Sequence, residues 1–294
     1  MPRALYPLCG TDEYDPVRLT KEFMLPTSRQ TMDRLLCFDC EQNLNRNGES
    51  WLLPLLPTLG GPFPLLDRLM KQLPFYSDTA LAAYASATNP EIDVPKLIHF
   101  AIGIFWKASV HSWLAGSDEP RIDLGEDGES LRLYLRGQAD LPKNIALYVA
   151  VDSGPIRLPG ILEPYQCSNP DFKNFCFFIP GMFFQLLIGA GVQERLAANC
   201  INANPRSPII VEEVSKVVRG ITREQSVAAR KTKKLLETTA EIEERGLSIK
   251  LGGESARTLD TLVRQRPCRP RWAGNKKQSH SPQTHPPGYD RRRA

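Results

Sequence analysis

Residues 95–114 constrain the fold more than any other segment of this chain. Leu97 to Leu114 is apolar on most faces and is interrupted mainly by His99, Lys107 and His111. A helix that is hydrophobic all round lies inside a core, and the charged positions argue against a membrane span. The pattern therefore predicts a central buried helix, in which the two histidines are core or boundary residues and not metal ligands.

The remaining segments predict an α+β fold with a mainly helical body and a small antiparallel sheet packed on the long helix. Pro, Gly and N-cap residues mark the boundaries between the predicted helices and strands. Helices are expected at 41–53, 64–73, 78–87 (with Asp78 as N-cap), 130–136, 209–220 and 222–245, and strands rich in β-branched and aromatic residues at 145–151, 176–180 and 182–188.

Charge separates the end of the chain from the rest. Residues 247–294 hold 11 Lys/Arg against 3 Asp/Glu, whereas residues 1–246 hold 26 against 30. Because this end is poor in aliphatic residues, we expect a basic disordered tail. Such a tail binds DNA or RNA through electrostatics, or is simply solvated. The candidate nucleic-acid contacts are Arg264, Arg266, Arg269, Arg271, Arg291, Arg292 and Arg293.

The run Cys37-Phe38-Asp39-Cys40-Glu41 contains the strongest candidate site. A Cys-x-x-Cys pair followed by a helix is typical of half a structural zinc site, which needs two further Cys or His ligands. Cys9 is a candidate third ligand, although a free thiol is the simpler interpretation. Two unligated cysteines beside a helix remain the alternative, and a thioredoxin-like dithiol is disfavoured because no βαβ pattern surrounds the pair.

Several motifs resemble a group of bacterial proteins related to the HNH (treble-clef zinc) nucleases. The resemblance covers about residues 1–210 and rests on the Cys37–Cys40 run followed by Gly48-Glu49-Ser50-Trp51, and on three downstream runs. These runs are 105–113 (FWKASVHSW), 131–135 (LRLYL) and 177–181 (FFIPG). The resemblance implies a truncated zinc-knuckle segment (1–57) followed by a helical-then-β body (58–210). Helical periodicity and composition add C-terminal helices (211–246) and the basic tail (247–294) to this domain order.

The resemblance also implies that part of the family's site is missing. The relatives carry an earlier Cys-x-x-Cys and a Ser-His-x-x-Pro segment, and Met1-Pro2-Arg3-Ala4-Leu5-Tyr6 resembles the residues after that His. We therefore expect the first knuckle and the catalytic His to be encoded upstream of Met1, or to be lost from a degraded copy. An HNH nuclease uses its His as general base and a divalent metal such as Mg²⁺ at the scissile phosphate. Mg²⁺ would therefore be relevant only with a complete upstream site.

Other residues give weaker signals. Asp123, Glu126, Asp127 and Glu129 lack EF-hand spacing, Ser153-Gly154 and Gly189-Ala190-Gly191 lack the context of a nucleophile elbow or phosphate loop, and Cys167, Cys176 and Cys200 have no metal spacing. Seven irregularly spaced cysteines and no signal peptide before residue 30 favour a cytoplasmic protein. Three classes remain: a zinc-binding, nucleic-acid-associated HNH relative, a non-catalytic scaffold without metal, and a metal-independent enzyme for which no residue constellation is found.

Overall fold

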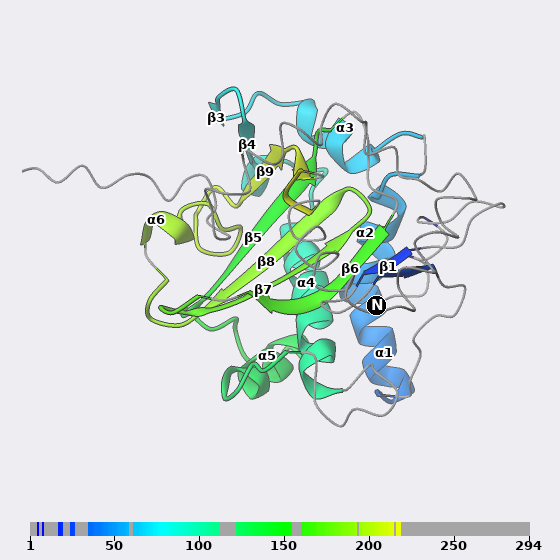
Figure 1. Cartoon of the computed structure of the whole chain (residues 1–294), viewed down its shortest axis with the longest axis vertical. Helices are drawn as coiled ribbons and strands as arrows, with labels where there is room; N and C mark the ends of the chain where they lie inside the picture. The colour runs from blue at the N-terminus through cyan, green and yellow to red at the C-terminus, as the bar shows by residue number, and fades with distance from the viewer. Residues whose placement is uncertain are drawn as a thin grey trace, which may run out of the picture. The chain divides into compact units, whose positions relative to one another are not determined.

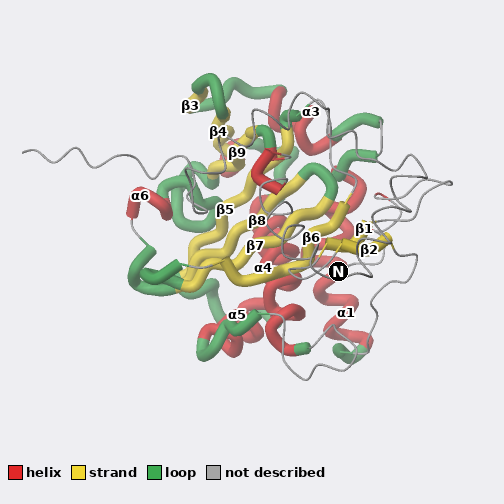
Figure 2. Tube along the Cα trace, in the orientation of Figure 1, coloured by secondary structure: helices red, strands yellow, loops and turns green. Residues whose placement is uncertain are grey.

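One mixed sheet organises the described part of the chain (Figures 1 and 2). The computed structural model describes residues 5, 8, 17–19, 24–26, 35–58, 61–111, 122–154, 160–167, 169–192, 194–214 and 216–218. The strands follow the order β2-β1-β6-β7-β8-β5-β9-β4-β3. The α+β class predicted from the sequence is confirmed. The expected tail, the helix at 222–245 and Cys9 lie outside the described residues.

The strands are β1 (Val17–Leu19), β2 (Met24–Pro26), β3 (Tyr76–Ser77), β4 (Leu81–Ala85), β5 (Ile145–Asp152), β6 (Gly160–Cys167), β7 (Lys173–Ile179), β8 (Met182–Ile188) and β9 (Pro208–Glu212). Two pairings are parallel, β1 with β6 and β5 with β9, and the others are antiparallel. The sheet is therefore larger than the small antiparallel sheet that the sequence predicts, and two of the eight pairings among the described strands are parallel. A mainly helical body is not confirmed either.

The helices are α1 (Phe38–Leu44), a π-helical turn (Asn45–Glu49), α2 (Ser50–Leu52), 3₁₀ turns at Leu53–Leu55 and Ser86–Thr88, α3 (Pro64–Met70), α4 (Val94–Val110), α5 (Asp127–Leu135) and α6 (Glu194–Ala197). The expected helices at 41–53, 64–73, 95–114 and 130–136 are confirmed in type, with shifted ends. No described helix is both long enough and apolar enough to cross a membrane.

Helix α4 lies against one face of the sheet, behind β5 to β8 in the view of Figure 1. Asp93 caps its first turn, since the carboxylate accepts a hydrogen bond of 3.1 Å from the Lys96 amide. The side chains of α4 join those of α1, α3 and α5 and the odd-numbered residues of β5 and β7 in one large core. A smaller core, which includes Tyr148, Phe178 and Ile210, lies on the opposite face of the sheet.

Two segments predicted to be helices contain strands, and the reason lies in tertiary pairing; in the second, 209–220, residues 214 and 216–218 are helical as expected. The segment 78–87 forms a turn and then β4, because Asp78 Oδ1 accepts hydrogen bonds from the amides of Ala80 (2.7 Å) and Leu81 (2.9 Å) as an Asx turn, not as a helix cap. Ile209 to Val211, expected to begin a helix, belong to β9, which pairs with β4 and β5. Strand pairing outweighs the helix propensity of the alanines in β4.

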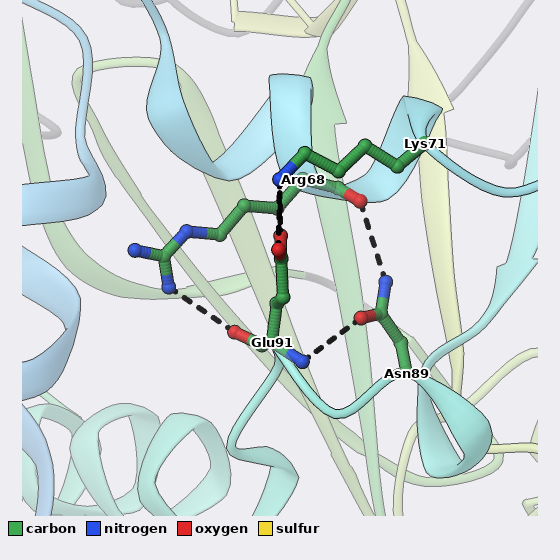
Figure 3. A network of polar contacts seen from close by, with 4 residues as sticks. All are labelled: Arg68, Lys71, Asn89 and Glu91. Atoms are coloured by element: carbon green, nitrogen blue, oxygen red, sulfur yellow. Dashed lines mark hydrogen bonds and ion pairs between the residues drawn. The ribbon is translucent and has the colours of Figure 1, made fainter.

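A network of polar contacts fixes the end of α3 to the segment that precedes α4 (Figure 3). The Arg68 guanidinium donates to the Glu91 carbonyl at 3.2 Å, and the Lys71 ammonium pairs with the Glu91 carboxylate at 2.7 Å. Asn89 donates to the Arg68 carbonyl at 3.3 Å and accepts from the Glu91 amide at 3.0 Å. These contacts orient the chain as it enters the central helix.

Candidate functional site

The Cys37–Cys40 pair lies at the start of α1, where the sequence places it. Cys37 is the N-cap residue, with φ −70° and ψ 163°, and its carbonyl accepts a hydrogen bond of 3.1 Å from the Glu41 amide. Cys40 lies three residues later, in the first helical turn, so the two thiol side chains project from the same turn of the helix. Cys37 is exposed and Cys40 is half-buried. Both thiols can therefore meet a ligand from solvent.

The two thiols are electrostatically different. Hydrogen bonding from the backbone amide and then the thiol of Cys40 stabilises the Cys37 thiolate and lowers the pKa of Cys37, against the opposing effects of desolvation and of the Asp39 charge. The pKa of Cys40 is raised, chiefly because its thiol hydrogen bonds to Cys37, while Arg136 acts in the opposite direction. Cys37 is therefore the first to ionise, and a thiolate is the form that binds metals or reacts.

Two thiolates on one helical turn match half of a tetrahedral zinc donor set. Within the described ranges, no group of three or more Cys, His, Asp or Glu side chains is placed to hold a metal ion. The described residues therefore offer only two of the four ligands that such a site would need, and the candidate third ligand, Cys9, lies outside them.

Helix α1 is held in place by polar contacts to α4 and α5. Lys107 of α4, whose side chain is 11% exposed, reaches Glu49 Oε1 at 3.3 Å and Glu41 Oε2 at 3.7 Å. On the other side, Asn43 donates to the Leu135 carbonyl at the end of α5 at 3.0 Å. Because Glu41 and Asn43 closely follow Cys40, these contacts fix the direction in which the thiol pair faces.

The Leu135 carbonyl also lies 3.2 Å from His99 Nε2. His99 is buried, and its Nδ1 has no hydrogen-bond partner among the described residues. His99 thus belongs to the support of α1, which agrees with the prediction of a core histidine. His111 lies at the end of α4. Trp113 and the start of the acidic loop fall outside the described residues, and Glu129 pairs with Arg132 on α5 at 2.6 Å.

The buried imidazole makes stability depend on pH. Desolvation lowers the pKa of His99, although its bond to Leu135 opposes this. In the unfolded chain the His99 imidazole takes up a proton near pH 6.5, whereas in the folded chain it stays neutral at that pH. The contribution of His99 to stability is therefore full above pH 6.5 and falls as the pH drops below it, by up to about 1.4 kcal/mol per pH unit. We expect His99→Gln to reduce this slope in urea titrations between pH 7 and 5. Equal slopes in the two proteins would contradict the assignment.

A second group of polar side chains was missed by sequence reasoning. Asp152 and Glu212 are paired positions at the carboxyl ends of the parallel strands β5 and β9, and Asp152 is fully buried. The Tyr148 hydroxyl donates to Glu212 Oε1 at 2.8 Å. Burial raises the pKa of Glu212, the bond from Tyr148 lowers it, and Asp152 raises it further. The only sequence signal is an Asp that ends an otherwise apolar strand.

A third group brings together two cysteines that the sequence leaves apart. Cys167 ends β6 and Cys176 lies within β7, and their sulfurs are 3.1 Å apart. Cys200 is separate, since its thiol donates to the Leu196 carbonyl at 3.5 Å. None of the five described cysteines is in a disulfide.

Comparisons with known proteins identify no relative of this chain. No protein-family model matches the chain, and no curated protein and no solved structure is significantly similar to it.

Proposed function

We propose that this chain is a zinc-binding relative of the HNH nucleases that associates with nucleic acid. Cys37 and Cys40 would supply two thiolates of a structural zinc ion, which would fix the start of α1. The proposal is carried by one observation, the position of two accessible thiols in the first turn of a helix that is anchored to the core. The β1–β2 hairpin precedes this helix, which is consistent with the treble-clef resemblance.

The proposed activity stops short of cleavage in this chain. In the resembling family the general base belongs to the Ser-His-x-x-Pro segment, and His99 does not take its place. His99 is buried with its Nε2 at the Leu135 carbonyl, where it supports α1 and does not face solvent. Mg²⁺-dependent cleavage would need a general base other than His99, so it is not part of this proposal. The tail arginines would add sequence-independent affinity for the phosphate backbone.

Zinc content tests the metal part of the proposal. The full chain, purified without added chelator, is expected to hold close to one zinc ion per chain by elemental analysis. The variant C37S/C40S is expected to hold almost none, because serine is a poor zinc ligand at neutral pH. The matched control C167S/C176S removes two thiols elsewhere and should keep the metal. Zinc below about a tenth of an equivalent in the unchanged chain would favour the second candidate, a scaffold protein without metal.

Binding to duplex DNA tests the other part. We expect retention at physiological salt and an affinity that falls steeply as salt rises, because cation release accompanies each phosphate contact. Replacing the seven tail arginines by glutamine should weaken binding and flatten the salt dependence. The net negative charge of residues 1–246 favours the scaffold alternative, and absence of DNA retention together with absence of zinc would establish it.

A further inference from the structure

Cys167 and Cys176 lie diagonally across the antiparallel pair β6–β7. The register places Tyr165 opposite Cys176 and Cys167 opposite Asn174. Cys176 belongs to the smaller core and Cys167 packs against it, so their side chains share one face of the sheet. Their sulfurs, 3.1 Å apart, need to approach by only about 1 Å to reach the length of a disulfide bond. The side chains of this strand pair therefore already bring the two sulfurs close to one another.

The two thiols differ in accessibility in the way that a stepwise reaction requires. Cys176 is 1% exposed, whereas Cys167 is half-buried at the end of its strand. Hydrogen bonding from Cys176 and, more weakly, from Tyr165 stabilises the Cys167 thiolate and lowers the pKa of Cys167 despite its burial. A reagent from solvent would thus meet the reactive thiol first, and its partner lies directly behind it.

We propose that Cys167 and Cys176 are a reversible redox site that forms a cross-strand disulfide by exchange with a small-molecule disulfide of the glutathione type. The Cys167 thiolate attacks one sulfur of oxidised glutathione, the S–S bond breaks, and one glutathione thiolate leaves. Cys176 then loses its proton and attacks the Cys167 sulfur, which displaces the second glutathione. Two protein thiols are oxidised to one disulfide, and one oxidised glutathione is reduced to two thiols.

A disulfide between Cys167 and Cys176 would affect the irregular part of the β6–β7 pair. The β6–β7 register shifts between Leu162 and Tyr165, so the ladder is irregular just before Cys167. A disulfide at Cys167 would fix the end of β6 beyond this irregularity. The site is independent of Cys37 and Cys40, so its failure and the failure of the zinc proposal are separate results.

The experiment uses the full chain carrying C37S/C40S, so that the exposed pair cannot contribute. After incubation with oxidised glutathione, we expect the intact mass to fall by two hydrogens, peptide mapping to join Cys167 to Cys176, and dithiothreitol to reverse both. In the same background, Cys176→Ser should accumulate glutathione on Cys167, because the resolving thiol is gone. Cys200→Ser should behave as the unchanged parent.

Tyr165→Phe tests the proposed environment of Cys167 through the rate of its alkylation, since the final disulfide should be the same. Loss of one hydrogen bond should slow alkylation of Cys167 roughly twofold to tenfold while the same disulfide still forms. The proposal is overturned if both thiols of the folded parent remain alkylatable after prolonged oxidation, or if Cys167 is found joined to any cysteine other than Cys176. Circular dichroism of each variant confirms that a folded chain is compared.

Discussion

Replacing Phe177 by alanine is expected to lower the free energy of unfolding by about 3–5 kcal/mol. Phe177 of β7 is fully buried between the sheet and α4. Its ring stacks on Phe184 with centroids 4.6 Å apart and meets Phe105 edge-on at 4.9 Å. Truncation would remove these contacts and leave a cavity, because neighbouring rings held by a strand and a long helix cannot collapse into the space.

Urea denaturation followed by tryptophan fluorescence measures the loss, and an unchanged m-value would show that the unfolded state is unaffected. If Phe177→Ala does not fold, Phe177→Leu should still fold and lose about 1.5 kcal/mol. The control is Phe38→Ala, since Phe38 is 76% exposed and its removal should change stability by less than about 0.5 kcal/mol. Similar losses at both positions would contradict this view of the core.

The central helix could be predicted because its signals are local. Asp93 and Pro95 mark its start, and an apolar surface on most faces requires burial wherever the helix lies. The strands β5, β7 and β8 were predictable for a similar reason, since Pro180 and Gly181 mark the turn between two aromatic runs. Gly181 adopts φ +77° there, a conformation that glycine takes without strain.

The missed strands lack a clear local pattern, and some of them depend on partners far away in the chain. Pro164 argues against a strand in residues 160–167, yet β6 accommodates it at the register shift between Leu162 and Tyr165. Strands β4 and β9 pair with each other across more than a hundred residues, and no local pattern reveals this. The mixed character of the sheet comes from two other long-range pairings, β1 with β6 and β5 with β9, which are parallel.

The candidate sites divide in the same way. The Cys37–Cys40 pair was predictable because both residues lie on one helical turn, so spacing alone brings the sulfurs together. Cys167 and Cys176 are nine residues apart and meet only through the β6–β7 register. Asp152 and Glu212 likewise meet only because β5 and β9 are parallel neighbours. Sequence spacing reveals sites within one element, and sheet topology decides those between elements.

The thiol-bearing helix is seated on α4 through a close backbone approach at Gly48. This glycine lies in the π-helical turn after α1 and is buried. A Cβ added there would lie 2.9 Å from Phe100 Cα and 3.0 Å from Phe100 N. These are backbone atoms in the middle of α4 and cannot move aside. We therefore expect Gly48→Ala to destabilise the protein by about 2–3 kcal/mol, although alanine favours helix more than glycine does.

A second glycine at the same interface gives the opposite expectation. A Cβ on Gly103 of α4 would find Leu44 Cδ2 at 3.5 Å and Leu135 Cδ2 at 3.9 Å, which are ordinary contacts. Gly103→Ala should therefore stabilise the protein by roughly 0.5–1 kcal/mol through helix propensity and a less flexible unfolded chain. Urea titrations of the two variants, measured side by side, show whether Gly48 is required by the close approach of the Phe100 backbone or whether the whole interface is crowded. If both substitutions destabilise equally, the interface is simply crowded, and the specific approach of the π-helical turn to Phe100 does not position α1.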